Sequence, residues 1–305
     1  MGVIYCKSVT RRDFIKAGLG AAAAALMPAA SRGLSSRPPL PGAVRLALMA
    51  DTHLPEVADS SNPPKGHYCY NPRGNLQKAV SQIVSQNPDG VVIAGDLARL
   101  EGKKGDYVLL KGLLNPLIEK TPVFTAMGNH DDRKNFYEVF DNFCGQKQAV
   151  KNKHVVVFDK PPVRVIVLDS MLYVNKVAGL LGKDQRHWLK QYLHNSDSTP
   201  TVLCLHHTLG DGDDELLDSD RFLRIIKPCR KVKAVIHGHH HDWGFYKIDD
   251  IAVINVPAVG YTFQEDMPVG WMQAELTAKG GDFTLHCIDG NMKQDGSVKS
   301  LRWRS

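Results

Sequence analysis

Cysteine is scarce and irregularly spaced in this sequence, which has six cysteines among 305 residues and no Cys-x-x-Cys pair. Once Cys6 near the amino terminus is set aside, an odd number remains, and this is not the pattern of a disulfide framework. The lack of paired cysteines also argues against a thiolate zinc site. Cys204 lies in the apolar stretch TVLCL and is typical of a buried cysteine that packs as a small hydrophobic residue.

Long hydrophobic runs and strong net charge are also missing. The apolar run at 17–27 is too short to cross a bilayer, which takes about 20 residues. The formal net charge is +6, but residues 1–33 hold five basic residues and one acidic residue, so only +2 remains for the rest. This balance argues against specific nucleic-acid binding. No cysteine directly follows the apolar run, which argues against a lipid-type membrane anchor.

Residues 1–33 have the organisation of an export signal. Arg11 and Arg12 are followed by Phe14, by Lys16, and then by the short run of small apolar residues. This arrangement resembles a twin-arginine signal peptide, which implies export to the periplasm or the medium by the bacterial twin-arginine translocation machinery. The alternative is an amino-terminal helix that simply contains two arginines.

Beyond a Pro-, Ser- and Gly-rich linker at 34–42, a single domain is predicted at 43–305. Short apolar runs predict strands at 44–50, 90–94, 122–127, 163–169, 201–205 and 233–237, and helical periodicity falls at 75–86, 106–119, 133–141, 183–194 and 214–226. Such alternation is typical of an α/β domain. The tail has four apolar stretches without a helix between them, which predicts antiparallel strands. A sandwich of two mixed sheets is the natural architecture.

Polar residues follow five of the predicted strands directly. They are carboxylates, imidazoles and one amide, without thiolate: Asp51, His53, Asp96, Asn129, His206, His239 and His241. The carboxyl ends of strands in an α/β sheet meet in one crevice, so these side chains can converge there. An oxygen and nitrogen donor set of this kind suits Mn, Fe, Zn or Co. Seven donors exceed the need of one ion, and two ions that share Asp96 would use them all.

The order of these motifs, D-x-H, G-D, G-N-H-D, H and G-H-x-H, resembles the calcineurin-like metallophosphoesterases over about 44–242. Within them, GNHDD and GHHH are most similar to the class III cyclic nucleotide phosphodiesterase and glycerophosphodiesterase branch. The resemblance implies a four-layer α/β/β/α sandwich with two metal ions. It implies one ion on Asp51, His53, Asp96 and His241, and the other on Asp96, Asn129, His206 and His239.

The implied activity is hydrolysis of a small phosphate ester, with a phosphodiester as the first choice, by a metal-activated hydroxide. The resemblance makes His130 the residue that contacts phosphate and protonates the leaving group, with a turn histidine as the alternative. A phosphomonoesterase acting on nucleotides or sugar phosphates is the rival enzyme. A non-catalytic metal-binding scaffold is the rival from another class, and it is disfavoured because no ligand is missing.

Several assignments stay open at this point. Adjacent residues on a strand end point to opposite sides, so only one of His206 and His207 is a direct ligand, and we choose His206. His237 lies in the strand and is expected behind the ligands, as is His207 if His206 binds. Asp131 either orients a neighbour in the catalytic machinery or caps the helix that follows. The loops at 54–74 and 256–271 carry aromatic residues that either contact substrate or are ordinary loop residues. The sequence leaves the oligomeric state open.

Overall fold

The computed structural model describes residues 40–57, 63–140 and 145–305. The predicted signal peptide at 1–33 and most of the predicted linker lie outside these ranges. Within them, no helix is long and apolar enough to span a bilayer.

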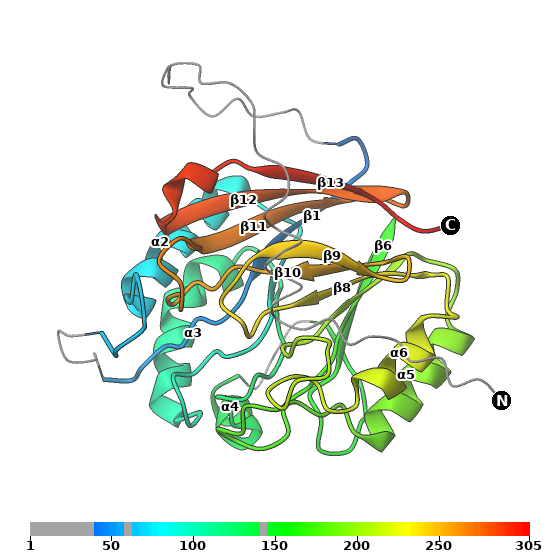
Figure 1. Ribbon diagram of the computed structural model, residues 1–305, viewed down its shortest axis with the longest axis horizontal. Coiled ribbons are helices and arrows are strands. Elements are labelled where there is room, and N and C mark those ends of the chain that lie inside the picture. The colour runs from blue at the N-terminus through cyan, green and yellow to red at the C-terminus, as the bar shows by residue number, and fades with distance from the viewer. Residues whose placement is uncertain (1–39, 58–62, 141–144) are drawn as a thin grey trace. The chain divides into compact units, whose positions relative to one another are not determined.

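Two mixed sheets form the centre of the domain (Figure 1). The first has the order β13 (Val298–Arg302), β12 (Gly280–Gly290), β11 (Pro268–Leu276), β1 (Val44–Met49), β2 (Gly90–Ile93) and β3 (Val123–Thr125). The second has the order β4 (Gln146–Lys147), β5 (Val156–Lys160), β6 (Val163–Val167), β7 (Thr201–Cys204), β8 (Val232–His237), β10 (Ile251–Asn255) and β9 (Gly244–Ile248). β1, β2 and β3 are parallel to one another, as are β6, β7, β8 and β10.

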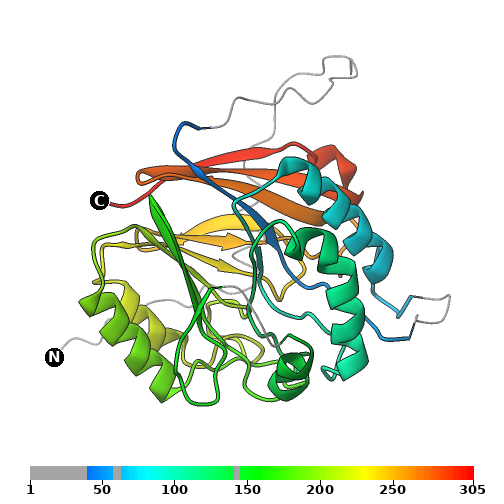
Figure 2. The same cartoon turned by 180° about the vertical axis from the view of Figure 1, so that it is seen from behind.

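Helices cover the outer face of each sheet, so the domain has the predicted four layers. The helices are α2 (Pro72–Gln86), α3 (Lys104–Ile118), α4 (Arg133–Val139), α5 (Lys183–Asn195) and α6 (Ser219–Ile226), with a short 3₁₀ turn, η1 (Met292–Gln294). Figure 2 shows α2 and α3 beside the first sheet and α5 and α6 beside the second. The four-layer α/β/β/α sandwich of two mixed sheets is therefore confirmed.

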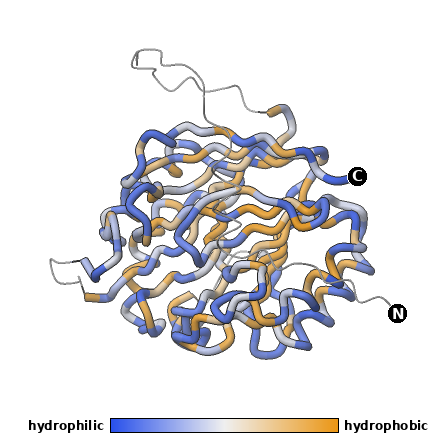
Figure 3. Tube along the Cα trace, viewed as in Figure 1, coloured by the Kyte–Doolittle hydropathy of each residue, from blue (hydrophilic) through white to orange (hydrophobic). Residues whose placement is uncertain are grey.

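Side chains alternate between two cores along each strand, because the side-chain period of a strand is two residues. In β1, Leu46 and Leu48 belong to the core between the two sheets, whereas Ala47 and Met49 belong to the core under α2 and α3. A third core joins the second sheet to α5 and α6. The central strands are accordingly apolar along most of their length (Figure 3), whereas the edge strands β4 and β13 are mostly exposed. Burial on both faces fixes the register of the strands, and hence the positions of the loops that follow them.

Two expectations about the chain's elements were wrong in part. The tail is not uniformly antiparallel, because β10 pairs parallel with β8, while β11 to β13 join the other sheet. α6 begins at Ser219 rather than 214. The residues before it leave the helical path because Leu216 forms a bridge to Gly179 and its N–H bonds the Thr208 carbonyl.

Candidate metal centre

The loops that follow β1, β2, β3, β7 and β8 bring the seven predicted ligands together in one buried cluster. On one side, the Nε2 atoms of His53 and His241 are 3.0 Å apart, and Asp51 Oδ1 is 3.6 Å from His241 Nε2. On the other side, His206 Nε2 lies 3.2 Å from both Asn129 Oδ1 and His239 Nδ1. Each half thus contains residues of one of the two predicted ligand sets, and Asp51 also lies within reach of Asp96 and His206.

Asp96 lies between the two halves. Its Oδ2 atom is 3.6 Å from His53 Nε2 and 3.3 Å from His206 Nε2. Its other oxygen, Oδ1, accepts a hydrogen bond from the backbone N–H of His130, which fixes the carboxylate. One carboxylate oxygen within reach of both histidine groups is the arrangement that a shared ligand requires.

Backbone carbonyls orient the histidine rings so that one nitrogen of each faces the cluster. His53, His206 and His241 place Nδ1 against the carbonyls of Arg99, Ala94 and Tyr261. A carbonyl only accepts, so Nδ1 carries a proton in each ring and Nε2 is the nitrogen that faces the cluster. His239 is turned the other way, because its Nε2 bonds the Asp214 carbonyl at 2.8 Å and its Nδ1 faces His206.

The charges of the cluster fit divalent cations. Burial lowers the pKa of His53 and of His239 to about 3, so both rings are neutral and able to donate a lone pair. Burial raises the pKa of Asp51 to about 7, because a carboxylate is costly to bury without a cation beside it. His206 is the exception, because the adjacent Asp96 carboxylate outweighs burial and raises its pKa to about 9. Neutral imidazoles and buried carboxylates with converging lone pairs are the donor set of a metal site.

Backbone strain is concentrated at the predicted ligands. Five of them have the left-handed conformation that non-glycine residues rarely adopt, with φ from 45° to 79°: Asp51, His53, Asp96, His239 and His241. Such strain persists only where the surrounding structure enforces it, and it is typical of functional sites. Here it lets loop residues two positions apart, such as Asp51 and His53, turn their side chains toward one centre.

Three glycines make room for the side chains of neighbouring loops. A Cβ atom at Gly128 would lie 2.1 Å from Asp96 Oδ1, and one at Gly238 would lie 2.5 Å from Asp51 Oδ2. A Cβ atom at Gly95 would lie 2.7 Å from the His206 ring. The glycines of the G-D, G-N-H-D and G-H-x-H motifs are therefore needed for close approach of the ligands.

His207 and His237 lie beside the predicted ligands. His207 Nδ1 is 2.7 Å from Ser170 Oγ, and its buried Nε2 has no hydrogen-bond partner among the described residues. His207 also forms a possible three-nitrogen group with His206 and His239, so it does not point fully away from its neighbour. His237 is turned toward Tyr246, whose hydroxyl is 3.2 Å from Nε2, and belongs to none of the possible ligand groups of the described chain.

His130 stands at the edge of the cluster, with 17% of its side chain exposed. Its Nδ1 bonds the carbonyl of Leu100 at 3.0 Å, and its Nε2 is 3.9 Å from Asp96 Oδ2. The ring therefore presents Nε2 to the centre from its solvent-accessible edge.

The structure excludes the helix-cap role of Asp131 and leaves the role of orienting a neighbouring group. It does not cap α4, because the cap is the Asp132 carboxylate, which accepts from Asn135 N–H. Nor does it reach the cluster as a catalytic group: it is fully buried and accepts hydrogen bonds from three backbone N–H groups and the hydroxyl of Tyr107. Asp131 ties the G-D loop to the G-N-H-D loop and is a positioning residue.

An aromatic wall, formed by His67, Tyr70, Tyr261 and Phe263, flanks one half of the centre. The rings of Tyr261 and Phe263 lie 4.4 and 4.5 Å from the ring of His241, centroid to centroid, and His67 lies 4.4 Å from Tyr261. Phe263 is 47% exposed. The two loops that supply the wall are joined by backbone hydrogen bonds between Tyr68 and Thr262.

Residues 44–243 match the family model of the calcineurin-like phosphoesterases. The chain belongs to this family. As a calcineurin-like phosphoesterase, it is a hydrolase of phosphoric esters, and the ligand cluster lies where its matching motifs converge. Residues 8–28 match the model of twin-arginine translocation signal sequences, so the chain carries an export signal for that pathway.

Two relatives of this phosphoesterase extend over most of its length. It is 26% identical over 258 residues to the 3′,5′-cyclic adenosine monophosphate phosphodiesterase of Haemophilus influenzae, covering 78% of this chain and 87% of that protein. It is 25% identical over 235 residues to the glycerophosphodiester phosphodiesterase of Enterobacter lignolyticus, covering 73% and 81%. A dimetal phosphatase from Danio rerio has the same fold, with a TM-score of 0.67, 16% identity, and 86% of this chain and 99% of that chain covered.

Proposed function

We propose that this phosphoesterase is an exported phosphodiesterase that works with two ions of Mn, Fe, Zn or Co. The observation that carries the proposal is the position of Asp96, whose Oδ2 is within 3.6 Å of histidine nitrogens on both sides. The preference for diesters is supported by the relatives, because both of those described act on phosphodiesters by name.

In this proposal, one ion is held by Asp51, His53, Asp96 and His241, and the other by Asp96, Asn129, His206 and His239. When bound, the ions supply Lewis-acid stabilisation of negative charge on the phosphoryl oxygens. The chain's residues fix the ligands before substrate arrives, through the carbonyls that orient the rings and the N–H groups that hold the carboxylates.

His130 acts on the substrate itself. Its Nδ1 is engaged by the Leu100 carbonyl, so Nε2 is the nitrogen available to the ester. In its protonated form Nε2–H donates a hydrogen bond to a phosphoryl oxygen and transfers the proton to the departing alkoxide, after which the ring is neutral. Asp131 acts through the backbone, by holding Gly128 and hence Asn129 and His130 in place.

The test compares hydrolysis of bis(p-nitrophenyl) phosphate and p-nitrophenyl phosphate by the mature protein loaded with manganese. We expect faster cleavage of the diester and loss of both activities in Asp96→Asn. A preference for the monoester would replace the proposal with a phosphomonoesterase. Metal binding without turnover of either ester would favour a scaffold role.

A further inference from the structure

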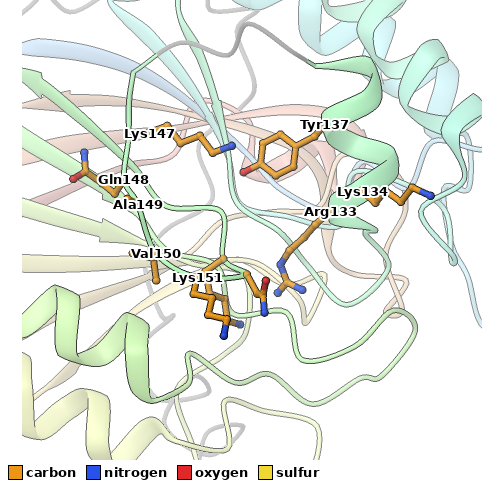
Figure 4. Close-up of a pocket in the computed structure, with 10 residues that line it drawn as sticks. Arg133, Lys134, Tyr137, Lys147, Gln148, Ala149, Val150 and Lys151 are labelled. Carbon is orange, nitrogen blue, oxygen red and sulfur yellow. The ribbon is translucent and has the colours of Figure 1, made fainter.

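A basic pocket lies on α4 and the segment between β4 and β5, outside the ligand cluster. It has a volume of about 690 Å³ and is lined by Arg133, Lys134 and Tyr137 and by residues 147–153 (Figure 4). None of these lining residues is acidic, and Lys147, Lys151 and Lys153 are among them. Its volume is in the range of small-molecule sites, about 300–1,000 Å³.

The floor of the pocket holds two fixed cations on one carboxylate. Asp169 is fully buried, and its oxygens accept from Arg133 Nε at 2.6 Å and Arg133 Nη2 at 2.7 Å. Lys153 Nζ is 3.7 Å from Asp169 Oδ1 and donates to the carbonyls of Met171 and Leu180. Asp169 compensates one of these two cations, and burial lowers the pKa of Lys153 to about 8.

The walls add uncompensated positive charge. Lys147 Nζ lies 3.7 Å from the centroid of the Tyr137 ring, and Figure 4 shows its ammonium group directed toward that ring. Neither Lys147 nor Lys151 forms an ion pair with a carboxylate of the described residues. Lys134 is at the rim, and its side chain points away from the others in Figure 4.

Such a concentration of charge is unusual for this chain, because only +2 of the formal +6 lies beyond residue 33. Like charges held together raise the free energy of the fold unless an anion binds among them. The side chains are also pre-positioned, because Asp169 and Tyr137 restrain three of the cations. A compact hollow with an excess of positive charge suits a small ligand with separated phosphates, whereas a nucleic acid needs a continuous basic groove.

We propose that this pocket binds a small organic anion with two or more phosphate groups, at a site separate from the metal centre. The inference does not rest on the phosphodiesterase activity, because the pocket contains none of the predicted metal ligands. The phosphates are bound by Lys147 and Lys151 at the wall, while Arg133 and Lys153 contribute positive charge from the floor.

Equilibrium dialysis with fructose 1,6-bisphosphate as the probe tests this, with the ester shown to be intact at the end of each run. The metal-loaded mature protein is compared with the pocket variant Lys147→Gln/Lys151→Gln. A matched control, Lys183→Gln/Lys190→Gln, removes the same charge from exposed positions on α5. Asp96→Asn disables the metal centre and leaves the pocket unchanged.

We expect about tenfold weaker binding in the pocket variant, from the loss of two charge contacts, and near-native binding in the α5 control and in Asp96→Asn. Binding lost in Asp96→Asn and kept in the pocket variant would assign the probe to the metal centre and overturn the proposal. Equally weakened binding of the probe by the pocket variant and by the α5 control would show that only the overall charge of the protein matters, and it would overturn the proposal. Absence of binding to the native protein would also overturn it.

Discussion

Replacing Asp131 by asparagine tests how much its hydrogen bonds between the G-D loop and the G-N-H-D loop contribute to stability. The carboxylate accepts from Leu97 N at 3.1 Å, Ala98 N at 3.1 Å, Gly128 N at 2.9 Å and the Tyr107 hydroxyl at 3.1 Å. An amide of the same shape keeps one acceptor oxygen but places an NH₂ group against a backbone N–H. The substitution therefore removes at least one charge-assisted hydrogen bond and weakens the others.

The expected loss of unfolding free energy is about 2 kcal/mol. A buried hydrogen bond to a charged group contributes about 1.5–3 kcal/mol. The new amide NH₂ group and the backbone N–H that it faces are both donors, which adds to the loss. Burial and the nearby Asp96 raise the pKa of Asp131 to about 6, so the neutral amide recovers part of the cost of burying charge. For a domain of this size, about 2 kcal/mol corresponds to a fall in Tm of about 4–8 °C.

Thermal and urea unfolding followed by circular dichroism measures this loss. The matched control is Asp132→Asn, the same chemical change one residue along, where asparagine caps a helix as well as aspartate does. We expect a change within about 0.5 kcal/mol for the control. An Asp131→Asn protein as stable as the control would refute the role assigned to Asp131.

The other predictions concern the centre and export. His130→Ala should keep both ions, measured by elemental analysis, while kcat on the diester falls about 100-fold; an unchanged rate removes His130 from the mechanism. Gly128→Ala should weaken metal binding, measured by competition with a chelator, because its Cβ would lie 2.1 Å from Asp96 Oδ1; native affinity would show that the carboxylate is free to move. Arg11→Lys with Arg12→Lys should retain the precursor in the cytoplasm, seen by cell fractionation; undiminished export would exclude the twin-arginine route.

The ligand cluster was predictable because it depends on strand ends, which short apolar runs mark clearly. The runs before Asp51, Asp96 and His206 are buried on both faces, so their periodicity and length identify them without knowledge of the partners. The position of the ligands then follows from the rule that strand ends in an α/β sheet meet in one crevice.

Other features depend on contacts between distant residues, which sequence patterns do not record. β13 was missed because its residues are mostly exposed and polar, and it is a strand only through pairing with β12. β10 lies between β9, its antiparallel neighbour, and β8, its parallel neighbour, and the apolar pattern does not show the second pairing. The buried environment of Asp131 follows from backbone groups more than 30 residues away.

The aromatic wall was predictable from the sequence only in part. Its residues fall in the two loops that the sequence singled out, but the rings of His67 and Tyr261 are nearly 200 positions apart in the chain. Their proximity comes from the backbone pairing of Tyr68 with Thr262. Aromatic content in a loop therefore indicated the place, and only the fold indicated that the rings pack against a predicted metal ligand.

Metal stoichiometry tests the central claim most directly. The mature protein is stripped with a chelator, reloaded with manganese, freed of excess ion and analysed for metal per chain, beside His241→Ala and Asp96→Asn. We expect two ions in the native protein, one in His241→Ala, which lacks a ligand of one set, and less than one in Asp96→Asn, which lacks the shared ligand. One ion in the native protein, or two ions retained in Asp96→Asn, would contradict the dinuclear centre with Asp96 as its bridge.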